Sequence, residues 1–198
     1  MATGVNYDEG GGPATFDALG DFMPGGWMAE IVRAFDAWSA AAAISFVEVA
    51  DLGEDFDAAQ LSGDIRIGGH VMDGAGGTLA HAFYPPANGV SAAGDLHFDN
   101  ADTWVIGFPG PGFDIFQVAA HEIGHSIGLA HTAVPNSLMN AFYSEAFSGP
   151  QADDIAGAQF LFGAAGGSAA PEPLTAMMAL ISLSTLGMII RRRGVPCT

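Results

Sequence analysis

The segment HEIGHSIGLAH, residues 121–131, holds three of the six histidines in the chain. His121 and His125 are four residues apart, so on a helix they lie on one face and both imidazoles can reach one metal ion. We expect Gly128 to end this helix and to turn the chain so that His131 supplies a third ligand. Three protein ligands leave one position of a tetrahedral zinc ion open, which is typical of catalytic zinc.

Glu122, next to the first of these histidines, is the candidate catalytic residue. Zinc at such a site polarises a carbonyl group and lowers the pKa of water, and a neighbouring carboxylate can accept the proton that the water loses. The residue types and their spacing therefore predict a zinc-dependent enzyme that hydrolyses peptide bonds. The alternative, a helix that carries histidines on its surface, explains neither the residue types nor the spacing.

The composition indicates one acidic domain. The chain has 198 residues, a formal net charge of -17 and no lysine, and three of its five arginines are residues 191–193. This length is enough for one domain with its own core. An acidic surface repels phosphate, so we expect no nucleic-acid partner, whereas carboxylates in glycine-rich loops suit calcium. Adaptation to salty surroundings would explain the charge equally well. Cys197 is the only cysteine, so no internal disulfide forms.

Hydrophobic periodicity predicts the elements that position these residues. Over residues 24–43, Trp27, Ile31, Phe35 and Trp38 recur at helical intervals and predict an amphipathic helix. Strands are predicted at residues 44–49, 64–67, 77–86 and 95–99, the third of them ending at two prolines. Two further helices are predicted, at residues 113–128 and 151–162. The order of helix, strands and helices indicates the α+β class.

The pattern His-Glu-x-x-His-x-x-Gly-x-x-His is that of the metzincins, and the surrounding sequence, from about Pro24 to Gly163, resembles the matrixins. The resemblance implies a metzincin-type catalytic domain: a mixed twisted sheet with an edge strand along the cleft, an active-site helix and a C-terminal helix. It also implies that Met139 lies in a tight turn beneath the catalytic zinc. Asp154 would brace this turn, unless it is an exposed charge at the start of the last helix.

The resemblance also identifies the substrate cleft. In matrixins the strand that corresponds to residues 78–83 is a sheet edge on which an extended peptide adds as a further strand. Leu79 and Ala80 on this strand, together with Tyr143, are the expected pocket residues. Ala141 stands where the family usually has proline, which leaves the shape of the pocket open.

The other three histidines match the matrixin ligands of a structural zinc. These are His70, His81 and His97, in the segments GGHVMDGAGGTLAHAFYPP and AGDLHFDNADTW. The family has an aspartate two residues after the first histidine, and this chain has Met72 there. The fourth ligand is therefore open, and Asp73 is one residue that could turn towards the zinc.

Calcium is implied by the same region. The family's side-chain ligands correspond to Asp73, Asp99 and Asp102, and the carbonyl groups of Gly74, Gly76 and Thr78 would complete the oxygen shell. A solvated acidic loop is the alternative. Asp64 and Asp95 resemble a second calcium site, in which alanines at positions 92 and 93 replace expected glycines.

Residues 171–198 indicate a membrane-related tail. The apolar run 174–190 would span about 26 Å as a helix, against about 30 Å for the hydrocarbon core, and three arginines follow it. A buried core helix is the alternative. The Pro-Glu-Pro tripeptide, apolar run and arginine cluster resemble a PEP-CTERM sorting signal. That implies membrane insertion through residues 174–190 before processing by an exosortase-type enzyme, in the envelope or outside a Gram-negative-type bacterium.

Four regions follow from these observations: an N-terminal segment 1–23, a catalytic domain 24–163, a linker 164–173 and the tail 174–198. The first residues show no secretory signal, so we expect a truncated or misassigned start. Matrixins are often kept latent by a propeptide cysteine at the open zinc position, and no such cysteine precedes the catalytic segment here. Either latency is handled otherwise or the chain is an incomplete gene product. The expected function is a secreted zinc metalloendopeptidase that acts on protein or peptide substrates. A non-catalytic, metal-stabilised surface module for binding or structure is the alternative, and Glu122 argues against it.

Overall fold

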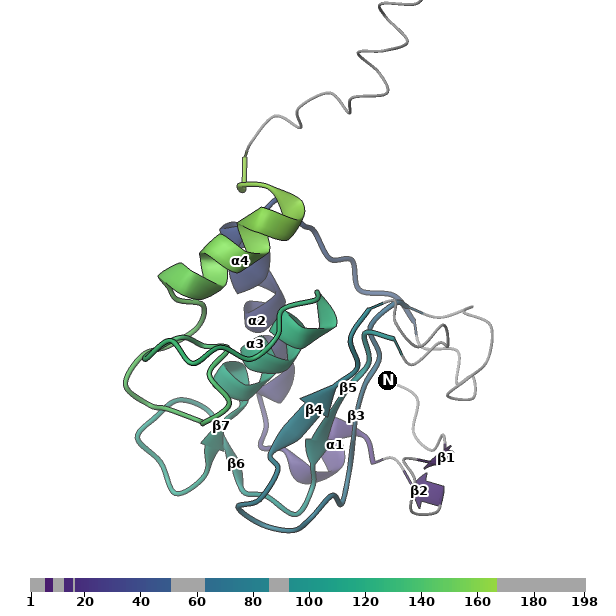
Figure 1. Ribbon diagram of the computed structural model, residues 1–198. Coiled ribbons are helices and arrows are strands. Elements are labelled where there is room, and N and C mark those ends of the chain that lie inside the picture. The colour runs from purple at the N-terminus through teal and green to yellow at the C-terminus, as the bar shows by residue number, and fades with distance from the viewer. Residues whose placement is uncertain (1–5, 9–12, 16, 51–62, 86–92, 167–198) are drawn as a thin grey trace, which may run out of the picture. The chain divides into compact units, whose positions relative to one another are not determined.

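The computed structural model describes residues 6–8, 13–15, 17–50, 63–85 and 93–166. The chain divides into two units, residues 1–165 and 166–198, and the first contains every described helix and strand. Figure 1 shows these elements, which in chain order are β1 (Asn6–Asp8), β2 (Pro13–Thr15), α1 (Leu19–Phe22), α2 (Trp27–Ala41), β3 (Ile67–His70), β4 (Ala80–Ala82), β5 (Leu96–Asp99), β6 (Trp104–Val105), β7 (Phe113–Asp114), α3 (Ile115–Ser126) and α4 (Ala152–Phe162).

The core lies around the contact between α2 and α3, as the amphipathic pattern predicted. Ile31 and Trp38 of the predicted stripe are buried, and Trp27 and Phe35 pack partly buried against the same cluster. The indole Nε1 of Trp38 donates a hydrogen bond of 2.8 Å to the carbonyl of Ala120. α2 is therefore fixed both by apolar burial and by a polar contact to the helix that carries the candidate active site.

The central sheet has the strand order β3-β5-β4, with β3 parallel and β4 antiparallel to β5. Among the described strands, β4 pairs only with β5, so the predicted edge strand is confirmed. Because side chains alternate along a strand, the register gives the sheet two different faces. The core face carries Ile67, Gly69, Ala80, Ala82, Leu96 and Phe98, and the opposite face carries Gly68, His70, His81, His97 and Asp99.

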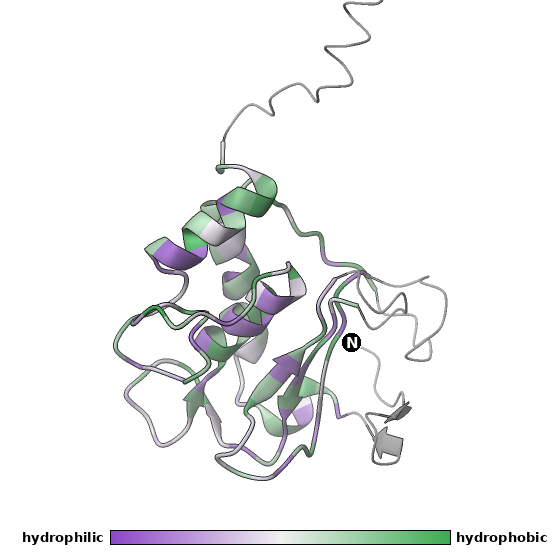
Figure 2. Cartoon of the chain, in the orientation of Figure 1, coloured by the Kyte–Doolittle hydropathy of each residue, from purple (hydrophilic) through white to green (hydrophobic). Residues whose placement is uncertain are grey.

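α3 and α4 begin with side-chain caps. Asp114 precedes α3, and its carboxylate accepts a hydrogen bond of 2.8 Å from the backbone N–H of Gln117. Gln151 and Asp154 form a capping box at the start of α4. Figure 2 shows that α4 changes from hydrophilic at its start to hydrophobic at its end. Both predicted helices and the α+β class are confirmed, with the helix bounds given above.

Three strand predictions differ from the structure. The strand predicted at residues 77–86 is shorter, Ala80–Ala82, and residue 86 lies outside the described residues. Residues 44–50 form no strand. Ile44 and Phe46 pack against the core and Val47 is exposed, so the side chains alternate as in a strand, yet the described residues provide no ladder partner. The strand predicted at residues 64–67 lies at 67–70, because the bonded register with β5 begins at Ile67. Elements α1, β1, β2, β6 and β7 were not predicted.

The predicted tail, including its apolar run at residues 174–190, lies outside the described residues. Within the part of the chain that the structure describes, no helix has both the length and the apolar content needed to cross a bilayer.

Candidate active site and metal-binding clusters

The imidazoles of His121, His125 and His131 converge on one point. Nε2 of His131 lies 3.1 Å from Nε2 of His121 and 3.1 Å from Nε2 of His125. Two of these side chains come from α3 and the third from the chain that follows it. Gly128 has φ +104°, and its N–H bonds to the carbonyl of His125 while that of Leu129 bonds to Gly124, both at 2.9 Å. The predicted helix end at Gly128, which returns His131 to α3, is confirmed.

Backbone carbonyls orient two of the three rings. Nδ1 of His121 lies 2.6 Å from the carbonyl oxygen of Leu138, and Nδ1 of His125 lies 2.7 Å from that of Leu129. A carbonyl only accepts hydrogen bonds, so both rings carry their proton on Nδ1 and direct the Nε2 lone pair at the common point. Burial lowers the pKa of His121 to about 4 and also lowers that of His125. Neutral, convergent nitrogens of this kind fit a zinc ion.

Glu122 points into a buried environment beside this cluster. The residue is 5% exposed, and among the described residues its Oε2 has no hydrogen-bond partner. Burial raises the pKa of the carboxyl to about 8, since the charged form has lost its hydration. A buried carboxylate without a fixed partner can hold a proton or release it at neutral pH, as a general base requires.

The pH dependence of stability should reveal this buried carboxyl in zinc-free protein. Between pH 4.5 and about pH 8 the folded state keeps the Glu122 proton that the unfolded state loses, so stability should fall as pH rises through this window. Glu122→Gln should remove that loss. Both proteins should still lose stability as pH falls from 6.5 towards 4, because His121 binds its proton more weakly when folded. Urea unfolding at a series of pH values measures this, and parallel curves above pH 5 would contradict it.

Met139 lies directly beneath the active-site helix. A Cβ added to Gly124 on α3 would lie 2.4 Å from the Met139 sulfur, so only glycine permits this approach. The turn around Met139 is held by Asp154, which is 3% exposed. Its carboxylate accepts hydrogen bonds from the backbone N–H groups of Leu138 (2.7 Å) and Met139 (2.9 Å), and from Ser137 Oγ. Asp154 is therefore not an exposed helix-terminal charge, and the predicted bracing contact is present.

The expected pocket residues lie on two different elements. Leu79 and Ala80 are partly buried where the chain enters β4, and the N–H of Asp99 bonds to the carbonyl of Leu79 at 2.8 Å. Tyr143 stands beside the start of α3. Its hydroxyl accepts a hydrogen bond of 3.0 Å from the N–H of Asp114, and its ring meets that of Phe113 edge-on. These contacts fix Tyr143 beside the start of α3, and its role as the wall of a pocket stays a prediction.

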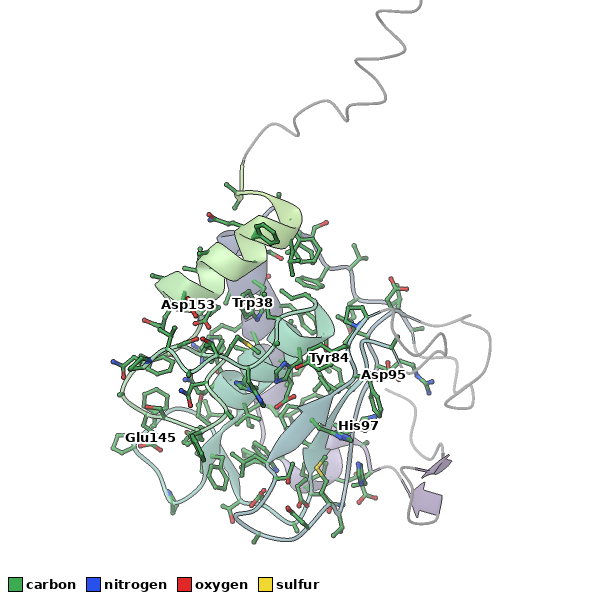
Figure 3. All side chains as sticks on the ribbon, viewed as in Figure 1. Trp38, Tyr84, Asp95, His97, Glu145 and Asp153 are labelled. Carbon is green, nitrogen blue, oxygen red and sulfur yellow. The ribbon has the colours of Figure 1, made fainter. Side chains whose placement is uncertain are left out.

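His70, His81 and His97 form a second cluster on the sheet face opposite the core. Each comes from a different strand, and Nε2 of His81 lies 2.8 Å from Nδ1 of His97. One nitrogen from each histidine lies within 4.8 Å of the others. Figure 3 labels His97 on this sheet. In the described part of the chain, these three histidines and the active-site triad are the only sets of three metal-ligating side chains gathered so closely.

Comparison with known proteins assigns the chain to a family. Residues 22–163 match the family described as Matrixin. The chain belongs to the matrixin family. It is 42% identical to human matrix metalloproteinase-20 over 137 residues, which are 67% of this chain and 27% of that protein. It is also 42% identical to the hatching enzyme of Paracentrotus lividus over 149 residues (70% and 23%) and 40% identical to karilysin of Tannerella forsythia over 122 residues (58% and 24%).

The match confirms the resemblance found in the sequence and, with the mixed sheet and helices, the predicted matrixin-like fold. This chain spans about a quarter of the length of the curated relatives it matches.

The acidic loop of this matrixin is organised by hydrogen bonds from its own backbone to carboxylates. Asp73 accepts bonds from the N–H (2.8 Å) and the hydroxyl (2.8 Å) of Thr78, which lower its pKa. Asp99 accepts from Gly74 at 3.3 Å, and Asp102 accepts from Gly76 at 2.6 Å. The carboxylate of Asp73 thus accepts hydrogen bonds from Thr78 and is not part of the histidine cluster. The sequence had left Asp73 open as a fourth ligand of the structural zinc.

Asp102 is a buried acid of this loop. Its Oδ2 is buried and has no hydrogen-bond partner among the described residues. Burial, together with the charges of Asp99 and Asp73, raises the pKa of its carboxyl. Carboxylates in a glycine-rich loop suit a hard cation such as calcium, so a calcium site at Asp73, Asp99 and Asp102 stays a prediction.

Asp64 and Asp95, the expected second calcium site, have different surroundings. Asp95 is fully buried, and its Oδ1 accepts a hydrogen bond of 2.7 Å from the N–H of Arg66. Asp64 is exposed. The described contacts join neither residue to a cluster of metal-ligating side chains, so a second calcium site stays a prediction.

The zinc content of two variants should show whether each histidine cluster binds its own zinc ion. The folded protein should hold about two zinc ions, and His81→Ala should remove one of them while peptide hydrolysis persists. Elemental analysis after dialysis measures this, with His125→Ala as the variant that should remove the other ion. An unchanged zinc content in His81→Ala would mean that the sheet histidines hold no metal.

Calcium should stabilise the wild-type protein by about 2.7 kcal/mol at a hundredfold excess over its dissociation constant. Asp102→Asn removes one of three mutually repelling carboxylates, so this variant should melt above the wild type without calcium and should not respond when calcium is added. Thermal melts across a calcium titration at fixed zinc and ionic strength measure both effects. A wild-type curve that does not move with calcium would mean that the acidic loop is only solvated.

Tyr84 is a site residue that sequence reasoning missed. Its hydroxyl lies 3.1 Å from Nδ1 of His125. The sequence pattern that could have identified Tyr84 is the alternation of side chains along the predicted strand. Alternation places Tyr84 on the same face as Ala80 and Ala82, which is the face towards α3.

Proposed function

We propose that this matrixin is a zinc-dependent endopeptidase with Glu122 as its general base. One observation carries the proposal. Three imidazole nitrogens converge, with Nε2 of His131 3.1 Å from that of His121 and from that of His125, beside a buried carboxylate whose Oε2 has no partner in the described part of the chain. Imidazoles oriented by backbone carbonyls would otherwise direct their lone pairs at one another at a cost in energy. His121, His125 and His131 would hold the zinc, which when bound polarises the substrate carbonyl and makes water more acidic.

The chain's own residues supply the proton transfers. Glu122 accepts a proton from the attacking water and later donates it to the amine nitrogen that leaves. Burial suits the carboxyl for both steps, because its raised pKa, about 8, lies close to neutral pH. Met139 packs tightly against Gly124 of α3, so the base and two of the ligands keep their relative positions.

The substrate that fits this site is an extended peptide. β4 is an edge strand whose second side is not paired within the described residues, so a peptide can add there through main-chain hydrogen bonds. Such bonds give affinity without reading sequence. Specificity then depends on the pocket that we assign to Leu79, Ala80 and Tyr143.

We propose two further metals and an exported location. His70, His81 and His97 would hold a structural zinc, and Asp73, Asp99 and Asp102 a calcium ion. The sequence of residues 171–198 supports a PEP-CTERM signal that an exosortase-type enzyme processes, with the catalytic domain outside the cytoplasm. Expression of the full chain with and without residues 171–198 in an exosortase-containing bacterium, followed by fractionation, tests the location.

Cleavage of a mixed peptide library tests the activity. Protein ending at residue 170 and the full chain should both cut the library, and a zinc chelator should stop the cutting reversibly. Fragment masses would also give the cleavage preference. Binding of library peptides by zinc-loaded protein without any cleavage would instead support the non-catalytic surface module.

A further inference from the structure

Tyr84 is placed by the edge strand against a ligand of the proposed zinc. Pairing with the neighbouring chain continues beyond β4, since the N–H of Phe83 bonds to the carbonyl of Asp95 at 2.9 Å and the carbonyl of Phe83 accepts from Gly94 at 2.8 Å. Tyr84 follows at once. Its side chain continues the core face of Ala80 and Ala82 and is the first large one on that face. Figure 3 shows Tyr84 between α3 and the end of the strands.

Two contacts join Tyr84 to His125. The hydroxyl oxygen lies 3.1 Å from Nδ1, and the two rings meet edge-on with centroids 5.2 Å apart, a favourable aromatic geometry. Nδ1 already has the carbonyl of Leu129 at the shorter distance of 2.7 Å. Because Nδ1 carries a single proton, that proton goes mainly to the nearer carbonyl and more weakly to the phenol oxygen, and the phenol also blocks rotation of the imidazole.

The three histidines of the triad differ in how firmly they are held. Nδ1 of His121 has one carbonyl partner, that of Leu138, and His125 has a carbonyl together with the tyrosine. For His131, which is exposed, the contacts known within the described residues give Nδ1 no hydrogen bond. His125 is thus the ligand with the most support, and part of that support comes from the proposed substrate-binding strand.

We propose that Tyr84 is a positioning residue that holds His125 in its zinc-binding orientation and links it to the edge strand. The inference rests on the proposed function, in which zinc is held by the triad. Tyr84 is 42% exposed, so a peptide laid along β4 would cover it and tighten its contact with His125. Zinc retention should therefore depend on a residue that is not itself a ligand.

Zinc transfer from the full-length, zinc-loaded protein to a chromophoric chelator tests this role. Tyr84→Phe removes only the hydroxyl and should lower the affinity for one of the two zinc ions roughly two- to tenfold. Tyr84→Leu also removes the ring edge and should lower the affinity for the same zinc ion roughly ten- to a hundredfold. Phe160→Leu is a matched change at a residue of α4 that is 89% exposed, and it should leave the affinity for both zinc ions unchanged. Melting temperatures of the zinc-free proteins should agree, because Tyr84 belongs neither to the buried core nor to the hydrophobic residues packed against it.

The possible outcomes distinguish this inference from the function on which it rests. Wild-type affinity for both ions in Tyr84→Leu would overturn the positioning role and leave the peptidase proposal intact. So would a zinc-free Tyr84→Leu protein that melts early enough to account for its loss of zinc, since the role would then be structural. If His125→Ala holds as much zinc as the wild type, the triad binds no zinc, and both proposals fail.

Discussion

Replacement of Glu122 by glutamine should lower the rate of peptide hydrolysis by roughly 10²- to 10⁴-fold, the range associated with loss of a general acid or base. Glutamine keeps the size of the side chain and removes its ability to take a proton. The zinc content should not change, because the three histidines and the carbonyl groups that orient them are untouched. Initial rates on one peptide found in the library screen, with zinc measured in the same samples, give the result.

The controls for this experiment separate chemistry from folding. Glu122→Ala should be as inactive as Glu122→Gln, since both lack the base. Glu48→Gln makes the same chemical change at an exposed position and should keep full activity. Retention of more than about a tenth of the wild-type rate by a zinc-loaded Glu122 variant would show that this carboxylate is not the general base.

The active-site triad could be predicted from sequence because its geometry is mostly local. A four-residue spacing on a helix fixes two ligands, and one glycine able to adopt positive φ explains how the third returns. The buried state of Glu122 is not local. It depends on core packing around α3, and no periodicity in the segment shows which side chain lacks a partner.

The second histidine cluster could be found only through resemblance to the matrixins. His70, His81 and His97 are on three strands, and the register between those strands decides whether they meet. The bounds of one of these strands were predicted wrongly, since β3 begins three residues later than predicted. Short strands offer few alternating residues, so the pattern alone fixes their ends poorly.

Tyr84 was missed because its importance comes from a contact between distant parts of the chain. Forty-one residues separate it from His125. In the sequence it stands before two prolines and has the appearance of a strand terminus. Strand alternation points the ring towards α3 only if the strand direction continues to Tyr84, and the paired backbone at Phe83 shows that it does.

Asp154 should be the most important single residue for the stability of the turn around Met139, which lies beneath the active-site helix. Its carboxylate accepts bonds from the N–H groups of Leu138, Met139 and Gln151, and from the hydroxyl of Ser137. Removal of one buried acceptor leaves several donors unsatisfied, each at a cost of about 1–3 kcal/mol. Since such costs do not add fully, we expect Asp154→Ala to lower the free energy of unfolding by about 3–5 kcal/mol.

The same substitution should also weaken zinc binding, which a general loss of stability would not explain at low temperature. The carbonyl of Leu138 orients His121, and the N–H of the same residue bonds to Asp154. Once that N–H is released, the turn can shift and His121 loses its fixed orientation. Asp153→Ala provides the matched control, because Asp153 is the neighbouring acid in the first turn of α4, labelled in Figure 3, and is exposed.

Asp153→Ala should lower the free energy of unfolding by only about 0.3–1 kcal/mol, because it removes one negative charge near the positive end of the helix dipole. Zinc affinity should not change. Urea unfolding of zinc-free proteins and zinc competition at 10 °C, where both variants are folded, measure the two effects separately. Equal unfolding midpoints for the two variants would show that the turn around Met139 holds without Asp154. A destabilised Asp154→Ala protein with wild-type zinc affinity would show that the turn does not position His121.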